Sequence, residues 1–174
     1  LQDLFHKTRR ALRRQVNGSL DMSDLARECR EEAREELIAA GVNETLFVDI
    51  WEDHSDDYFV RTRPEDVVWH TRTVLEHGDG PLPLVAVRST GRGTEVFVYD
   101  EDRDYLFAAT ATILERLGLT IMDARIFSVS HSRRTFDSFT VLEANGDRID
   151  GPEREIEIRR TLHKRLAEPE KAAY

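Results

Sequence analysis

Hydrophobic positions recur with two different spacings along this 174-residue chain, and the spacing changes at residues 78–83. Before that stretch, apolar residues return every three to four positions, which predicts helices. We expect four of them, over residues 3–16, over about 24–40 with Ser23 as N-cap and Gly41 as C′ residue, after Asn43, and from Thr62 to Pro64 onward. The polar run from Asp53 to Asp57 reads as a turn. The first 79 residues therefore form a helical segment.

After the glycine- and proline-rich stretch, four segments are rich in β-branched and aromatic residues, which favours strands. They cover residues 84–89, 94–99, 119–129 and 135–143. Two further segments, 105–118 and 152–167, carry apolar residues at helical spacing, and Pro152 suits the first turn of the second one. The order is strand, strand, helix, strand, strand, helix. It predicts an α+β protein with an antiparallel sheet.

The last seven residues, 168–174, contain no strand pattern. A ferredoxin-like sheet needs a fourth strand after its second helix, so segment 84–89 has to fill that place from the other end of the domain. The Thr90–Gly93 loop allows a hairpin between 84–89 and 94–99. We predict the sheet order 84–89, 94–99, 135–143, 119–129, and three regions: a connector (1–79), a sheet domain (80–167) and a tail (168–174).

Composition narrows the classes of function. Hydrophobic residues make up 40% and charged residues 34%, which is typical of a water-soluble globular protein, and no apolar run is long enough to cross a bilayer. The net charge of −9 argues against nucleic-acid binding, because neutralising phosphates takes an excess of Lys and Arg. A single cysteine, Cys29, excludes a disulfide framework. The chain opens inside a helical pattern, which suggests a piece of something longer.

The residue types that usually carry out catalysis are not arranged for it. The six histidines do not stand at metal-ligand spacing, and no P-loop, GxGxxG motif or nucleophile elbow occurs. Aspartates cluster at residues 53–57 and 100–104, where their ordinary role is local hydrogen bonding in turns. We therefore predict no catalytic residue, no metal site and no cofactor in this chain.

One turn has a plausible binding role. The segment from Asp100 to Tyr105 links a strand to the N-terminus of a helix, where backbone N–H groups can hold an anion. The candidate ligand-binding residues are Asp102, Asp104, Tyr105 and Leu106 in this turn, with Asp123 and Arg125 on the following strand. Asp123 and Arg125 can face a second copy of the chain and bind the charged ends of an amino acid. Alternatively, Arg125 simply pairs with a neighbouring acid.

Three segments resemble the family of bifunctional PII uridylyltransferase/uridylyl-removing enzymes of bacterial nitrogen control. They are DYFVRTRPEDVVWHT (57–71), TEVFVYDEDRDYLFAATATILERLGLTIMDARI (94–126) and TFDSFTVLEANG (135–146). The similar region lies between the HD hydrolase domain and the end of the first ACT domain in that family. Residues 1–79 then correspond to a helical connector, and residues 80–167 to an ACT domain.

The resemblance implies a regulatory fragment acting in the cytoplasm. In the family, a nucleotidyltransferase domain attaches UMP to PII with UTP and Mg²⁺, the HD domain removes it, and ACT domains sense glutamine. The motifs of the two catalytic domains are absent from this sequence, so we expect no activity from this chain alone. ACT domains that bind amino acids commonly carry Pro-Gly in the turn where this chain has Asp104-Tyr105.

Two roles follow for the ACT-like domain. It senses or relays glutamine status to the catalytic domains, or it is a dimerisation scaffold that binds no small molecule. In both cases we expect self-association through the sheet, because residues 119–127 form an apolar edge strand.

Overall fold

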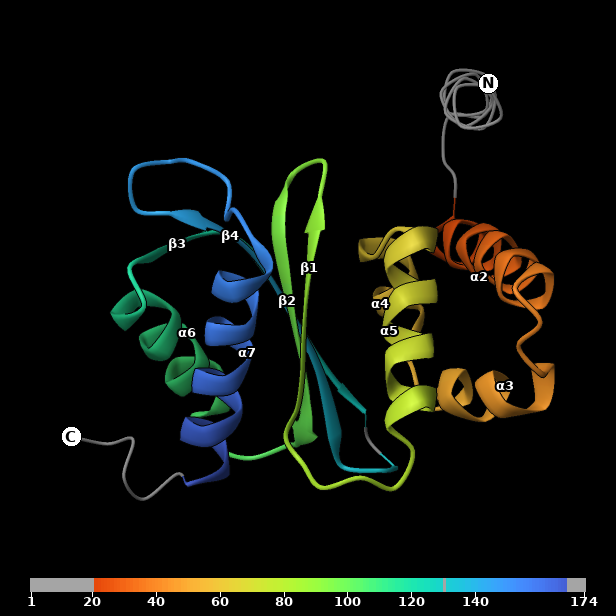
Figure 1. Cartoon of the computed structure of the whole chain (residues 1–174). Coiled ribbons are helices and arrows are strands. Elements are labelled where there is room, and N and C mark those ends of the chain that lie inside the picture. The colour runs from red at the N-terminus through yellow and green to blue at the C-terminus, as the bar shows by residue number, and fades with distance from the viewer. Residues whose placement is uncertain (1–20, 130, 169–174) are drawn as a thin grey trace. The chain divides into compact units, whose positions relative to one another are not determined.

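The computed structural model describes residues 21–129 and 131–168 (Figure 1). These residues form two compact units: residues 21–44 with 55–68, and residues 45–54 with 69–168. The boundary between the units falls inside one helix, α5 (Pro64–His77). The predicted helix over residues 3–16 lies outside the described residues. The predicted division at residues 79 and 80 stays a prediction.

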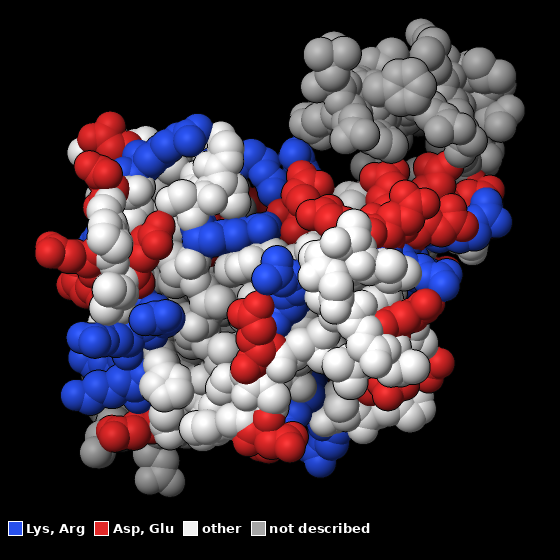
Figure 2. Space-filling view, turned by 45° about the vertical axis from the view of Figure 1, so that its right-hand side comes forward, with Lys and Arg blue, Asp and Glu red and all other residues white. Residues whose placement is uncertain are grey.

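The first unit is built around helix α2 (Met22–Ala39), which packs with the short helix α4 (Asp56–Arg61). Asp21, and not the predicted Ser23, is the N-cap of α2, because its carboxylate accepts a hydrogen bond from the Ser23 N–H at 3.4 Å. Gly41 has φ +80 and ends the helix as predicted. Figure 2 shows acidic side chains gathered over α2 on the upper right.

Helix α4 corrects the expectation of a plain polar turn before Tyr58. Residues 53–55 do form a turn, but Asp56 and Asp57 lie in the first turn of this helix, where carboxylates suit the helix dipole. Its residues Tyr58 and Phe59 are buried, and the helix packs against α2, which carries the buried Cys29. The Cys29 thiol donates to the Thr62 carbonyl oxygen at 3.5 Å.

The second unit contains a four-stranded antiparallel sheet. The strands are β1 (Leu84–Thr90), β2 (Gly93–Glu101), β3 (Leu119–Val129) and β4 (Arg134–Glu143). The sheet order is β1-β2-β4-β3, which is the order in which the sequence pattern arranges the four segments. An α+β fold of the ACT-like type is thus confirmed. β1 lies antiparallel beside β2, in the place of the fourth strand of a ferredoxin-like sheet.

Helices cover the sheet on both faces (Figure 1). Helices α6 (Leu106–Arg116) and α7 (Pro152–Ala167) bury one face with an apolar core that includes Val96, Phe139 and Ile158. On the other face, the part of α5 from Trp69 onward places His70 in a stack on Phe97, with ring centroids 4.3 Å apart. Helix α3 (Glu44–Glu52) is tied to this part of α5, because the Trp51 indole N–H donates to the Thr71 hydroxyl at 3.0 Å. Every position of β2 from Gly93 to Val98 is therefore buried.

Candidate functional site

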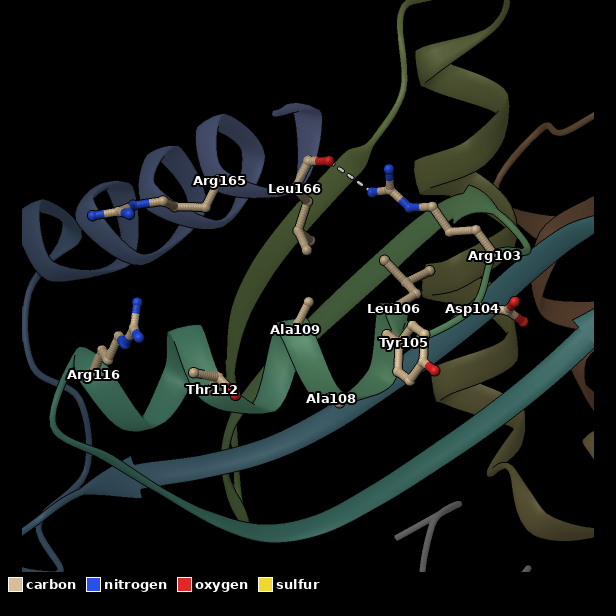
Figure 3. A pocket seen from close by; sticks show the side chains of 10 residues that line it. All are labelled: Arg103, Asp104, Tyr105, Leu106, Ala108, Ala109, Thr112, Arg116, Arg165 and Leu166. Atoms are coloured by element: carbon tan, nitrogen blue, oxygen red, sulfur yellow. Dashed lines mark hydrogen bonds between the residues drawn. The ribbon is translucent and has the colours of Figure 1, made fainter. Parts of the chain in front are cut away.

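A groove of about 490 Å³ runs between α6 and α7 and reaches the turn that joins β2 to α6 (Figure 3). Its floor is largely apolar and includes Leu106 and Ala109. Asp104 and Tyr105 lie at one end, while Arg116 and Arg165 come from the last turns of the two helices. The size falls within the usual range of small-molecule sites, about 300–1,000 Å³. This groove is the candidate site.

The turn at the entrance is held by a chain of hydrogen bonds. The Asp100 carboxylate accepts from the Glu101 N–H and from the Arg103 guanidinium, both at 2.8 Å. Arg103 also donates to the Leu166 carbonyl oxygen at 2.7 Å, a bond drawn in Figure 3. Arg103 therefore ties the turn before α6 to the last turn of α7. Asp100 is buried, which raises the pKa of its carboxyl even though the Glu101 N–H and Arg103 favour the ionised form.

The N-terminus of α6 is open to the groove. Tyr105 is the N-cap residue, has φ +65, and makes no side-chain capping bond. Its side chain points outward and is 84% exposed, while the next residue, Leu106, is buried. The first N–H groups of a helix lack partners within the helix, so this end can accept an anion. Asp102 lies just before the groove, and its N–H donates to the Arg133 carbonyl oxygen at 2.8 Å.

The other two predicted ligand-binding residues lie on the opposite face of the sheet. Asp123 and Arg125 pair in register with Thr140 and Ser138, whereas Phe139 between these two belongs to the core under α6 and α7. The Arg125 guanidinium forms an ion pair with Asp123 at 3.0 Å, as the simpler of the two interpretations of Arg125 expected. Within one copy, the structure separates these residues from the groove.

Sequence reasoning missed a buried carboxyl on β4. Asp137 is 1% exposed and lies beside Thr135, whose hydroxyl contacts the carboxylate. Burial raises the pKa of Asp137 to about 7, against the hydrogen bond from Thr135, and the charges of Asp102 and Asp100 raise it further. The sequence did contain a signal for this burial. Along the predicted strand 135–143, Asp137 alternates with Thr135, Phe139 and Val141, so all four side chains share one face of the sheet.

A second missed group is Glu95 on β2, on the opposite face. It accepts hydrogen bonds from Ser138 at 2.8 Å and from Arg88 at 2.6 and 3.0 Å, and lies 3.1 Å from the His70 ring nitrogen. Burial alone would raise the pKa of Glu95, but His70 and Arg88 together outweigh it and lower the pKa to about 2. Arg88 also stacks over the Trp69 ring at 4.1 Å. This network fixes the part of α5 from Trp69 onward to the sheet.

Neither acid belongs to a metal centre. Across residues 21–129 and 131–168, no group of three or more His, Cys, Asp or Glu side chains is placed to hold a metal ion. In the same part of the chain, no helix is long and apolar enough to span a membrane.

The groove also contains residues that the sequence did not single out. Arg103, Arg116 and Arg165 line it, together with Thr112 and Leu166. A basic run in the last turns of the final helix, with Lys164 and Arg165, was the available signal.

Comparison with known proteins gives a consistent result. Residues 21–73 match the family model of the uridylyltransferase GlnD fifth domain. The chain is 36% identical over 98% of its length to a bifunctional uridylyltransferase/uridylyl-removing enzyme of Pseudomonas aeruginosa (strain LESB58), and it spans 19% of that protein. The enzyme of the same name from Methylococcus capsulatus is 39% identical over 91% of the chain and 18% of its own length. The resemblance predicted from the sequence is confirmed, and the chain spans about a fifth of these relatives.

Proposed function

Since this chain matches a segment of bifunctional uridylyltransferase/uridylyl-removing enzymes over nearly its whole length, we propose that it is the regulatory part of such an enzyme. Residues 80–167 act as an ACT domain that passes glutamine status to catalytic domains beyond this chain. Those domains attach UMP to the PII signal protein, using Mg²⁺, and remove it again in the cytoplasm. Residues 1–79 are the connector, and residues 168–174 are a tail.

The turn between β2 and α6 supports relay more than reception. A ligand approaches this turn most closely when the residue before the helix has no side chain. Tyr105 occupies that position in the left-handed conformation that glycine adopts most easily. Its ring lies at the mouth of the groove and obstructs a backbone approach (Figure 3). The parent's glutamine signal then reaches this domain from another one.

Calorimetric titration with glutamine tests this assignment. The wild-type chain should release no saturable heat at millimolar glutamine. The double variant Asp104→Pro/Tyr105→Gly restores the Pro-Gly step and should gain saturable binding. Saturable binding by the wild type that disappears in Arg125→Ala would make this domain a receptor and overturn the relay. Transfer of UMP to PII by this chain alone would overturn the regulatory assignment altogether.

The edge strand β3 supplies the surface for relay between copies. Met122 and Ile126 are 58% and 37% exposed on this edge. If two β3 strands pair antiparallel about Ala124, Asp123 of each copy lies opposite Arg125 of the other, and Met122 lies opposite Ile126. The segment is thus complementary to itself, as a two-fold interface requires.

Exchanging the charges on β3 tests this pairing. Asp123→Arg places like charges opposite each other and should convert the dimer into a monomer, as measured by light scattering. The double variant Asp123→Arg/Arg125→Asp restores opposite charges and should restore the dimer. A wild-type monomer, or a dimer that is unchanged in the single variant, would contradict pairing through β3.

The alternative function is a dimerisation scaffold that binds and transmits nothing. In an enzyme containing the catalytic domains, Asp123→Arg should blunt the glutamine response of PII uridylylation if this domain relays the signal. A response that remains the same in the monomeric variant would favour the scaffold.

A further inference from the structure

The end of the α6–α7 groove away from Tyr105 holds two arginines that have no partner within the described residues. Arg116 and Arg165 both line the groove, yet neither forms an ion pair or a hydrogen bond with another described residue. They also border a smaller adjoining hollow of about 200 Å³. Figure 3 shows both side chains at the same end of the groove.

Two other arginines beside these helices are held by hydrogen-bond partners, in contrast to Arg116 and Arg165. Arg154 binds the Glu143 carboxylate at 2.9 and 3.0 Å and the Leu117 carbonyl oxygen at 2.6 Å. Arg103 is held by Asp100 and by the Leu166 carbonyl oxygen. The positions one helical turn before Arg116 and Arg165 are both threonines, Thr112 and Thr161, so neither arginine has an acid there.

We propose that this groove binds a small organic anion with an apolar or aromatic body. Arg116 and Arg165 hold the anionic head, a phosphate or a carboxylate, through charge-assisted hydrogen bonds. The body covers the apolar floor of Leu106, Ala108 and Ala109. Two like charges beside a floor of this kind repel each other, and an anion between them removes that repulsion while the body excludes water.

This ligand class differs from the glutamine of the proposed function. Glutamine is a zwitterion with a polar amide side chain, so it would bring an ammonium group to the two arginines and leave the apolar floor uncovered. A macromolecular polyanion fits less well, because the net charge of the chain is −9. The site therefore stands whether or not the domain responds to glutamine.

A matched pair of fluorescent probes tests the site. 8-Anilinonaphthalene-1-sulfonate has an aromatic body and an anionic head, and N-phenyl-1-naphthylamine has the same rings without the charge. Titrated into the 174-residue chain, the sulfonate should bind saturably at one site. It should bind about tenfold or more tightly than the neutral probe, because charge-assisted hydrogen bonds are strong.

Two double variants with equal charge change show where the probe binds. Arg116→Ala/Arg165→Ala should weaken sulfonate binding about tenfold or more and leave the neutral probe unaffected. Arg159→Ala/Arg160→Ala is the control, because this pair lies on α7 beside a different hollow, near His77 and Pro81. The control should bind the sulfonate within about twofold of the wild type, because only long-range charge effects remain.

Filling the groove gives a second line of evidence that does not depend on charge. Thr112 is exposed and lines the groove, so Thr112→Trp should block the floor while circular dichroism stays that of the wild type. Equal sulfonate binding by the arginine variant and its control, equal binding of both probes, or no effect of Thr112→Trp would each overturn the site. Displacement of the probe by phenyl phosphate or by benzoate, with benzyl alcohol as the neutral control, then shows which anionic head the site prefers.

Discussion

The buried carboxyl of Asp137 leads to a prediction about stability against pH. The substitution Asp137→Asn keeps the shape of the side chain and an oxygen that can accept from the Thr135 hydroxyl, and it removes the charge. Asp137 is 1% exposed, so solvent screens its charge very little. Because its pKa is raised from an ordinary 3.8 to about 7, the folded protein resists ionising this group.

The sign of the effect follows from proton linkage. Below pH 3.8 the carboxyl is protonated in both the folded and the unfolded chain, and its full contribution to stability is present. Between pH 3.8 and about 7 only the unfolded chain loses the proton, so the free energy of unfolding falls by about 1.4 kcal/mol per pH unit. The total loss approaches about 4 kcal/mol at pH 8, and the asparagine variant does not suffer it.

The local hydrogen bonds agree with a protonated Asp137. The Thr135 hydroxyl contacts the Asp137 carboxyl and lies 3.4 Å from the Phe127 carbonyl oxygen, but it has one proton. When Asp137 is protonated, it donates to Thr135, which is then free to donate to Phe127. When Asp137 is ionised, the Thr135 hydroxyl donates its proton to the carboxylate, and the hydrogen bond to the Phe127 carbonyl oxygen is lost.

Urea denaturation followed by circular dichroism at pH 4.5, 6 and 8 measures the effect. The variant should gain stability relative to the wild type as the pH rises, and the difference should level off above pH 7. Asp150→Asn changes an exposed carboxylate and serves as the control. A difference for Asp137→Asn that is the same at pH 4.5 and at pH 8 would refute the reasoning.

Two further predictions concern β2 and the turn after it. Glu95→Gln removes the buried partner of Arg88 and should lower the free energy of unfolding at pH 7 by about 3 kcal/mol, measured by urea denaturation. Since the pKa of Glu95 is lowered to about 2, this loss should shrink as the pH falls from 4.5 towards 2, and a constant loss would contradict the ion pair. Tyr105→Gly removes the strain of a left-handed residue whose ring is exposed. It should raise the free energy of unfolding by about 0.5–1 kcal/mol, measured as a slightly higher melting temperature. The stability of Tyr105→Asn should fall between those of the wild type and the glycine variant. A destabilised glycine variant would show that the ring contributes packing.

The sequence was most informative where structure depends on neighbouring residues. The bounds of β3 match the predicted segment, and α7 covers its predicted range, because strand and helix spacing are local properties. Errors arose where two local signals compete. Asp21 and Ser23 are both good N-cap residues two positions apart, and the aspartates that start α4 also suit turns.

The candidate site was only partly predictable for a different reason. Tyr105 and Leu106 were found from the turn before a helix, which is a local pattern. Arg116 and Arg165 lie far apart in the sequence and come together only because α6 and α7 pack side by side on one face of the sheet. The residue pattern within α6 or within α7 gives no indication that Arg116 and Arg165 will be neighbours.

The sequence by itself determined most of the elements, the order of the strands and the resemblance of the chain to a uridylyltransferase segment. Only the tertiary structure decided which polar groups are buried and what they meet. Glu95 receives its charged partners from α5 and β1, and its pKa falls, whereas Asp137 is buried among other acids, and its pKa rises. The same carboxyl chemistry gives opposite results because the free energy of a buried charge depends on groups that folding brings from distant parts of the chain.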